Sequence, residues 1–337
     1  MLKARPYAAA LFVLVLVVGA IGLGGCSSST TTTTAAPATT AAPTTQTTAA
    51  PTTETTATTG TTSAFDVTTV KADPAINAML PSGIKSAGVM KVASDIPYPP
   101  WEMFVGNTSQ PTGFDYDLSQ AIAAKMGIKA DFINTKFDSI ILSLQSGKND
   151  VAMSDMYDNK TRQKVLDFVD YANDGTSILV AKGNPNKITN LDSLAGLTVG
   201  CEKGTTQAAL LDNLNKTFAS SGKAQMTINQ YPDQPSALLA VKSGKVVGDL
   251  TDHSTAEYVA QSQGGGNDFE VVADPSAPNG YEPQLVGAGI LKSNTQLRDA
   301  FQKALQALID DGTYKQIIDK YGLLPVQSAQ INQGTGA

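Results

Sequence analysis

The sequence predicts an α/β fold built on mostly parallel sheets, and three observations support this fold class. Short runs rich in β-branched residues alternate with segments of helical period from about residue 72 to about residue 326. The 337 residues, 42% of them hydrophobic, suffice for about two domains with their own cores. Glycines stand just after four of the helical segments, where helices commonly end: Gly147, Gly222, Gly244 and Gly312.

The expected elements follow this alternation along the chain. Strands are expected at residues 89–94, 129–133, 150–153, 177–181, 198–201, 225–231, 246–250, 270–273 and 286–291. Helices are expected between them, at residues 114–126, 139–145, 207–218, 235–242, 253–261 and 295–310. The regular alternation of strand patterns with helical patterns indicates βα units that share one or two sheets.

The composition excludes several classes of function. Acidic residues outnumber basic ones by 30 to 24, which gives a formal charge of −6, whereas a nucleic-acid-binding protein presents a basic face. Cys26, Cys201 and the single histidine, His253, are too few for a cysteine–histidine zinc site or a disulfide framework. Cys201 is expected to be a buried thiol, and neither a metal nor a cofactor is expected.

Residues 1–25 have the pattern of an export signal. Lys3 and Arg5 precede an unbroken apolar run over residues 8–18. This run is shorter than the roughly 20 residues of a membrane span. Leu-Gly-Gly then precedes Cys26, which resembles the lipobox of bacterial lipoproteins. The resemblance implies cleavage before Cys26 and a lipid anchor on its sulfur at the outer face of the cell membrane, with an ordinary secretory signal as the alternative.

A disordered tether is expected over residues 26–71. Between residues 27 and 64, 19 of 38 residues are threonine, most others are alanine, serine or proline, and Glu54 carries the one charge. Such a composition cannot bury a core. The segment is therefore predicted to hold the folded body away from the membrane.

A proline-rich loop with two aromatic residues follows the first predicted strand. It reads Asp95-Ile-Pro-Tyr98-Pro-Pro-Trp101-Glu102. Ligands of open α/β sheets bind beyond the carboxyl ends of the strands, so Asp95, Tyr98 and Trp101 are candidate ligand-binding residues. The alternative is that the two aromatic side chains only cover the core.

Two further segments place charged residues next to predicted helices. Gly113-Phe-Asp-Tyr-Asp-Leu leads directly into a helix, where acidic residues also complement the helix dipole. The segment 150–162 follows a strand and ends at Arg162. A guanidinium pairs bidentately with carboxylates, so Arg162 is a candidate carboxylate-binding residue, with a solvated surface arginine as the alternative.

In this order, the segments resemble the bacterial solute-binding proteins of family 3, the polar amino-acid receptors of ABC importers. The resemblance spans roughly residues 90–322 and includes a turn, Gly200-Cys-Glu-Lys-Gly-Thr-Thr-Gln207, and a strand that ends at Asp252. It implies a two-lobed type II periplasmic-binding-protein fold with two hinge crossovers and a ligand in the interlobe cleft. The lobes are expected at 72–174 with 283–327 and at 175–282, followed by a flexible tail at 328–337.

The resemblance also implies roles for individual residues. Arg162 takes the position that binds the ligand α-carboxylate, with help from the turn at residues 200–207. Asp252 takes the position that accepts the α-ammonium, and a helix N-cap is its alternative role. The ligand-binding residues expected in full are Asp95, Tyr98, Trp101, Ser154, Asp155, Tyr157, Arg162, Glu202, Thr205, Thr206 and Asp252.

Five positions depart from the family pattern, the first being Tyr116, which is aromatic where an aliphatic residue is usual. Tyr157 stands where Ser or Thr is typical, Asp158 where an aliphatic residue is usual, and Val247 where Asp is frequent. Asp155 stands where the family has a small residue, and it adds an acid to Asp95 and Glu202. These carboxylates favour a cationic ligand, so a basic amino acid such as arginine, lysine, ornithine or histidine is expected. Glutamine, another neutral polar amino acid or an amino-acid derivative is the alternative.

The function that follows is capture by hinge closure and delivery to a membrane permease, without bond cleavage. The protein is expected to be a monomer without a nucleic-acid partner. Some proteins of this fold are cyclohexadienyl dehydratases, for which Asp95, Asp155 or Glu202 would supply the acid, and this enzyme class is kept as an alternative. A surface adhesin or a sensor receptor is a third class.

Overall fold

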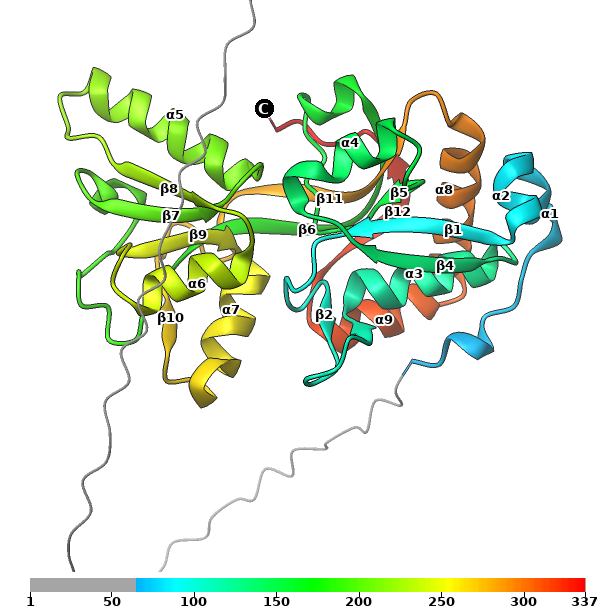
Figure 1. The fold of residues 1–337 in the computed structure, drawn as a ribbon, viewed down its shortest axis with the longest axis horizontal. Coiled ribbons are helices and arrows are strands. Elements are labelled where there is room, and N and C mark those ends of the chain that lie inside the picture. Colours follow the sequence, from blue (N-terminus) through cyan, green and yellow to red (C-terminus); the bar gives the residue numbers. More distant parts are fainter. Residues whose placement is uncertain (1–64, 337) are drawn as a thin grey trace, which may run out of the picture. The chain divides into compact units, whose positions relative to one another are not determined.

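The computed structural model describes residues 65–336, and the predicted signal segment, Cys26 and tether residues 27–64 lie outside them. Within the described residues, ten strands form one sheet in the order β4-β1-β5-β11-β6-β9-β7-β8, with β10 and β12 also paired to β6. The strands β2 and β3 form a separate pair. Helices pack on both sides of the sheet in each of two lobes (Figure 1).

The strands have the following bounds: β1 Val89–Ser94, β2 Met103–Phe104, β3 Pro111–Thr112, β4 Lys129–Asn134, β5 Val151–Ala152, β6 Leu166–Ala181, β7 Thr198–Glu202, β8 Thr227–Tyr231, β9 Gly248–Asp252, β10 Phe269–Val271, β11 Tyr281–Leu291 and β12 Leu324–Ile331. The α-helices are α1 Pro74–Met79, α2 Ser82–Ala87, α3 Phe114–Lys125, α4 Ile140–Gln145, α5 Thr206–Ser220, α6 Gln234–Lys242, α7 His253–Ser262, α8 Thr295–Asp310 and α9 Thr313–Tyr321.

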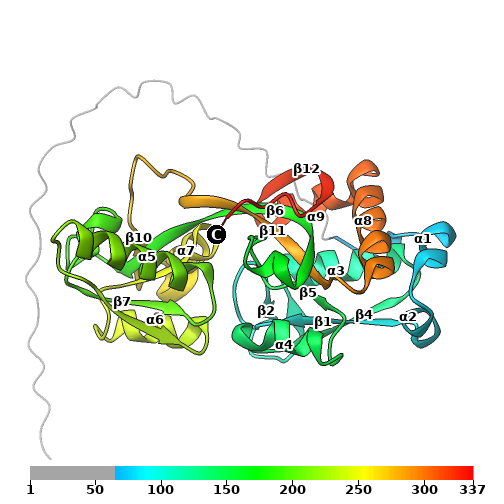
Figure 2. The same ribbon diagram turned by 90° about the horizontal axis from the view of Figure 1, so that it is seen from above.

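Two long strands, β6 and β11, connect the lobes. The first part of β6 pairs with β11 and β12, and its last part pairs with β9 and β10. Figures 1 and 2 show both strands passing from one lobe to the other. Three parallel strands flank this antiparallel centre on each side: β4, β1 and β5 in lobe 1, and β9, β7 and β8 in lobe 2. The prediction of parallel sheets therefore holds within each lobe but not at the crossover.

Each lobe has its own hydrophobic core. The largest core belongs to lobe 1, where α3, α8 and α9 pack against the sheet with Phe114, Leu118, Phe301 and Ile317 almost fully buried. The core of lobe 2 surrounds β7 and α5, and it contains Cys201, Leu211 and Phe218. Burial raises the pKa of the Cys201 thiol to about 12, so Cys201 behaves as an apolar core residue.

Local sequence explains where several helices begin. Thr205 caps α5 and Asp233 caps α6, each by accepting a hydrogen bond from a backbone N–H of the first turn. Asp73 caps α1 in the same way, with Pro74 at the first helical position. These caps place the N-terminus of α5 directly at the end of β7, where the turn at residues 200–207 was expected.

Both ends of the folded body differ from the predicted boundaries. Residues 67–69, expected in the disordered tether, form a short 3₁₀ helix capped by Asp66, and Phe65 and Val70 pack against the lobe 1 core. Residues 328–331, expected in a flexible tail, belong to β12 and pair with β6. Both segments are ordered because their apolar side chains or backbone groups contact residues that are far away in the sequence.

The crossover strands approach each other closely at two glycines. A Cβ on Gly280, whose φ is +86°, would lie 2.8 Å from the carbonyl carbon of Gly175 and 2.9 Å from the backbone nitrogen of Thr176. A Cβ on Gly175 would lie 2.5 Å from the carbonyl oxygen of Asn279. These distances leave no room for a side chain, so the hinge depends on glycine at both positions.

Gly280→Ala is therefore expected to destabilise the protein. The steric overlap should cost about 1–3 kcal/mol, in addition to the cost of a positive φ at alanine. Gly183→Ala is the matched control, because Gly183 has a φ of +80° and no atom within 4 Å of the added Cβ. Urea unfolding of both variants gives the two losses. Equal losses would show that the close approach of β6 and β11 does not contribute.

Candidate functional site

A pocket between the lobes collects most of the predicted ligand-binding residues. Its walls come from the ends of β1, β5, β7 and β9 and from the N-terminus of α5. The lining residues are Asp95, Tyr98, Phe137, Ser154, Asp155, Arg162, Glu202, Thr205, Thr206, Gln207 and Asp252. Strand ends from both lobes thus meet at one place, as expected for ligands of α/β sheets.

Asp95 and Ser154 form the part of the lobe 1 wall that follows β1 and β5. The Asp95 carboxylate accepts a hydrogen bond from the backbone N–H of Phe137 at 2.8 Å and lies 3.3 Å from Nζ of Lys136. The Ser154 hydroxyl donates to Oε1 of the buried Glu102 at 2.6 Å and accepts from the backbone N–H of Asp95. Asp95 is therefore held in place and partly neutralised by Lys136.

Asp155 presents a buried carboxylate to the pocket. Its backbone adopts a φ of +44° and donates to Oδ2 of Asp115 at 2.9 Å. Neither carboxylate oxygen of Asp155 has a hydrogen-bond partner within residues 65–336, although the residue is only 5% exposed. Burial and the nearby charge of Asp252 raise its pKa well above the usual value. A cation in the pocket would satisfy this carboxylate.

Arg162 presents its guanidinium to the same pocket. Nη1 donates to the carbonyl oxygen of Tyr157 at 2.9 Å, Nη2 donates to that of Gly204 in lobe 2 at 3.3 Å, and the group lies 5.3 Å above the Phe137 ring. It forms no ion pair with any residue between 65 and 336. Burial lowers its pKa to about 10, so the group stays charged at neutral pH. The predicted alternative, a solvated surface arginine, is excluded by this burial.

Asp252 ends β9 and lies on the lobe 2 side. It stands at the N-cap position of α7, but its side chain makes no capping hydrogen bond. Its oxygens instead accept from the Tyr98 hydroxyl at 2.5 Å and from Nε2 of Gln207 at 2.8 Å. The carboxylate is thus turned into the pocket, which disagrees with capping as its role.

Glu202 ends β7, and its carboxyl group is buried in the pocket. Burial, followed by the charge of Asp95, raises its pKa to about 9, so it carries a proton at neutral pH in the absence of a ligand. Its Oε1 has no hydrogen-bond partner among the described residues. Glu202 and Asp95 together form a second acidic region of the pocket.

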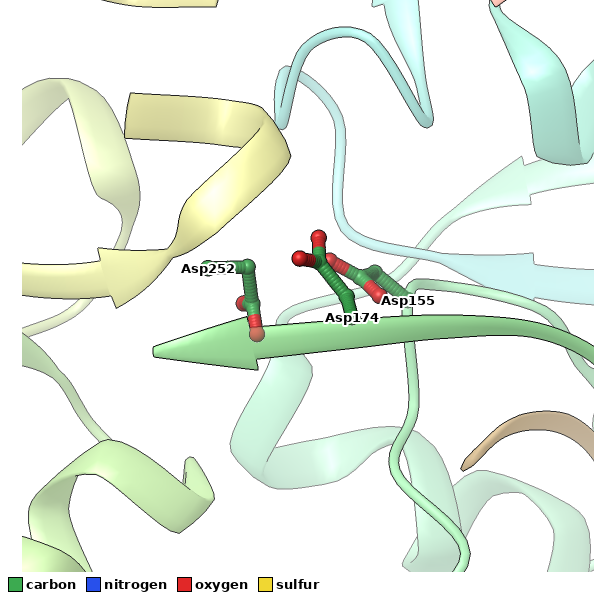
Figure 3. A group of neighbouring side chains, drawn as sticks. All are labelled: Asp155, Asp174 and Asp252. Carbon is green, nitrogen blue, oxygen red and sulfur yellow. The ribbon is translucent and has the colours of Figure 1, made fainter. Parts of the chain in front are cut away.

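Three carboxylates face one another beside Arg162. Oxygens of Asp155, Asp174 and Asp252 lie within 4.8 Å of one another, from three different elements (Figure 3). All three are buried, and burial together with Asp252 raises the pKa of Asp174 to about 7. Such a group suits a cation, either an ammonium or a metal ion, because mutual repulsion is relieved only by a proton or a positive charge.

Several contacts between the lobes close the pocket. The Tyr98 hydroxyl also contacts Oγ1 of Thr251 at 2.7 Å, and Lys136 bridges Asp95 to Asp233 at 2.9 Å. Nζ of Lys203 lies 2.9 Å from the Asp138 carboxylate. The structure is therefore the closed form of the two lobes.

Two predicted ligand-binding residues do not line the pocket. Trp101 is fully buried against Phe114 and Tyr171, and its Nε1 donates to Oγ of Ser254 in the other lobe at 2.8 Å. Tyr157 is also buried, and its hydroxyl has no hydrogen-bond partner among the described residues. Burial and the charges of Asp252 and Asp174 raise the pKa of its phenol, which therefore lies near the acids of the pocket. For Trp101 the prediction is corrected, because the apolar ring gains more by packing in the core than by facing a polar pocket.

The prediction omitted two lining residues, Phe137 and Gln207. Phe137 follows β4, the neighbour of β1, so its place beyond a strand end was available as a signal. Gln207 stands inside the turn already identified, one residue after Thr206. Its contact with Asp252 joins residues 45 positions apart, which no local pattern indicates.

Comparison with known proteins assigns the chain to a family. The model of the bacterial extracellular solute-binding proteins, family 3, matches residues 90–323. The chain belongs to this family. The expected two-lobed type II fold is thereby confirmed together with the observed architecture, and members of the family act outside the cytoplasmic membrane as binding components of ABC transporters.

Individual relatives agree with this assignment. The lysine/arginine/ornithine-binding periplasmic protein of Escherichia coli (strain K12) is 33% identical over 211 residues, which cover 62% of this chain and 78% of that protein. An ancestral arginine-binding protein solved with arginine is 32% identical, with a TM-score of 0.61 over 69% of this chain and 98% of its own. An ancestral amino acid-binding protein described as a precursor of cyclohexadienyl dehydratase is 30% identical, with a TM-score of 0.61 over 71% and 97%.

No helix within residues 65–336 has both the length and the apolar character that crossing a membrane requires.

The buried acids make a prediction about pH. In the unfolded chain Glu202 loses its proton near 4.5, whereas the folded protein keeps it until about 9, and Asp115 and Asp249 keep theirs until about 7. The folded state therefore binds more protons between these values, and stability falls as the pH rises through this window. Urea unfolding of the ligand-free protein at pH 5, 7 and 9 is expected to show this decline, by up to about 1.4 kcal/mol per pH unit and group.

Glu202→Gln serves as the control for that experiment. It keeps the shape of the side chain but cannot titrate, so the decline between about pH 7 and 9 should become flatter. Stability that rises over this range in the unchanged protein would contradict the assigned direction of the shifts.

Proposed function

We propose that the protein is the substrate-binding component of an ABC importer for a basic L-amino acid. The observation that carries this proposal is the distribution of charge in the closed pocket. The guanidinium of Arg162 is buried and forms no ion pair within residues 65–336. Among these residues, the buried carboxylates of Asp155 and Asp252 in the same pocket also lack cationic partners. An amino acid carries the complementary groups at matching positions.

The α-carboxylate of the ligand is proposed to bind Arg162. The guanidinium has donors left after its two carbonyl contacts, and charge-assisted bonds to a carboxylate are about twice as strong as neutral ones. Thr205 and Thr206, the N-cap and the first residue of α5, line the pocket, and the free N–H groups of this helix N-terminus add to the attraction for an anion.

The α-ammonium is proposed to bind between Asp252 and Asp155. The two carboxylates come from opposite lobes, so an ammonium between them stabilises the closed form and not the open one. Tyr98 and Gln207 fix the orientation of Asp252, which leaves its remaining lone pairs for the ligand.

The basic side chain is proposed to extend toward Asp95 and Glu202. Lys136 balances only one of these two acids, and Glu202 would lose its proton when a guanidinium or ammonium arrives. The lysine/arginine/ornithine-binding and arginine-binding relatives support this choice. The proposed ligand-binding residues are those that line the pocket together with Tyr157. Phe137 and Gln207 are thereby added to the predicted set, and Trp101 is removed from it.

The proposed partners follow from the family. The closed, liganded form would dock on a membrane permease, and lipid on Cys26 would keep the protein at the outer face of the membrane. No bond of the ligand is broken in this function. The lobes are proposed to be residues 65–174 with 283–336 and residues 175–282, opening about the crossovers in β6 and β11.

Isothermal titration of the purified protein tests the proposed ligand class. Arginine, lysine and ornithine are expected to bind more tightly than glutamine, and Arg162→Ala or Asp252→Asn to weaken binding by about 2–5 kcal/mol, because each leaves a buried charge unpaired. Lys315→Ala and Asp192→Asn are matched charge controls, since both side chains are largely exposed and far from the pocket. Glutamine binding more tightly than arginine would refute the basic ligand.

A dehydratase is the second candidate, favoured by the relative described as a precursor of such an enzyme and by the proton that Glu202 retains at neutral pH. A protonated carboxyl in a closed pocket is able to act as a general acid. Incubation with prephenate and arogenate at neutral pH decides between the two candidates, because phenylpyruvate or phenylalanine forms faster than in the protein-free control only if the protein is an enzyme.

The lipid anchor has its own test. Labelled fatty acid fed to cells is expected to appear in the wild-type protein and to be absent from Cys26→Ala, because only the sulfur at this position would carry the lipid. The label is measured after electrophoresis of the purified proteins. Equal labelling of both would refute the anchor and leave an ordinary secretory signal.

A further inference from the structure

The last residues of the chain contact the loop that carries Arg162. This loop, Tyr157–Arg162, joins the end of the β5 region to the 3₁₀ helix that begins at Arg162. The residues 333–336, named here the C-terminal clasp, follow β12 and run beside the loop. The family model matches residues 90–323, so the clasp lies beyond the matched residues.

Asp158 is the centre of this contact. Its side chain is fully buried, and Oδ2 accepts a hydrogen bond from the backbone N–H of Gly334 at 2.6 Å. Oδ1 accepts from Nε2 of Gln163 at 2.7 Å, and the same amide donates to the carbonyl oxygen of Gly334 at 3.0 Å. A buried carboxylate is costly unless such donors reach it, so the clasp is needed at this position.

Backbone contacts extend the clasp along the loop. The N–H of Lys160 donates to the carbonyl oxygen of Gly336 at 2.8 Å, and Asn159 forms a bridge with Gly336. The Asn159 side chain accepts from the N–H of Arg162 at 2.8 Å, and the Arg162 guanidinium donates to the carbonyl oxygen of Tyr157. A continuous set of hydrogen bonds thus leads from the C-terminus to the guanidinium.

Gly334 fits only as glycine. A Cβ built on it would lie 1.9 Å from the carbonyl oxygen and 2.6 Å from the carbonyl carbon of Asp158. Both are backbone atoms of the loop, so any side chain at position 334 must push the clasp and the loop apart. Thr335, the next residue, is exposed. The chain therefore offers a disruptive and a neutral substitution at adjacent positions.

We propose that the C-terminal clasp and Asp158 are positioning elements for ligand binding, which hold the loop so that the Arg162 guanidinium faces the pocket. Two observations support this proposal: the Asp158 carboxylate is fully buried, and its partner Gly334 lies beyond the residues that the family model matches. The clasp thus supplies a hydrogen-bond donor to the buried Asp158 carboxylate, and Asp158 in turn holds the clasp against the loop. The role of Arg162 toward the ligand carboxylate rests on the proposed function, whereas the hold on the loop does not.

The test compares arginine with agmatine, the same molecule without its carboxylate. Gly334→Ala is expected to lower the affinity for arginine about tenfold, a loss of about 1.4 kcal/mol, because the guanidinium is displaced from the carboxylate. Affinity for agmatine should change less than about twofold, since agmatine makes no contact with Arg162. A loss of general stability would lower both affinities alike, so the ratio isolates the positioning role.

Thr335→Ala is the matched control. The clasp contacts the loop through backbone atoms of Gly334 and Gly336, so loss of the exposed Thr335 side chain should leave both affinities unchanged. Asp158→Asn is the second variant, and it tests the proposal if Gly334→Ala does not accumulate as folded protein. It removes the charge at position 158 but keeps the size of the side chain. It should shift the ratio in the same direction. A ratio of arginine to agmatine affinity that stays constant in both variants would overturn the proposal.

Hydrogen exchange of the amides of residues 158–163 tests the clasp without any ligand. Faster exchange in Gly334→Ala than in Thr335→Ala supports the hold on the loop, and equal exchange overturns it. If the unchanged protein binds neither arginine nor any other basic amino acid, the proposed function fails, and the exchange measurement alone then decides whether the clasp holds the loop.

Discussion

The cost of burying carboxylates governs the arrangement of this protein. Closure of the two lobes brings Asp155, Asp174 and Asp252 to within 4.8 Å of one another in a place from which water is largely removed. Like charges at this distance cannot all remain ionised without a positive partner. The closed form must therefore hold either extra protons or a cation. A cationic ligand that supplies the charge also supplies the free energy of closure.

The strand connections of the fold bring these three carboxylates together. Asp252 is the last residue of β9, Asp155 follows the end of β5, and Asp174 lies within β6 at the crossover, so the antiparallel centre made by β6 and β11 sets the distance between the two walls. Glycines 175 and 280 allow these strands to pass closely, which places the hinge directly behind the site.

Local sequence patterns were sufficient to predict most of the helices and strands and part of the pocket. The strand at Val89–Ser94 and the helix at Thr295–Asp310 were predicted with their observed bounds, and the pocket contains Asp95, Arg162 and Asp252 as expected. Contacts between distant segments were not predictable in this way. Asp158 and Gly334 are 176 residues apart, and the prediction of a flexible tail failed because nothing local to residues 328–336 indicates their partner.

A crystal structure of the protein with arginine tests the central claim most directly. The account predicts that the α-carboxylate contacts the Arg162 guanidinium, that the α-ammonium lies between Asp155 and Asp252, and that the guanidinium of the ligand points toward Asp95 and Glu202. A ligand bound in the reverse direction, or an α-ammonium that leaves Asp155 without a partner, would contradict the account, since the buried carboxylates would then need another source of positive charge.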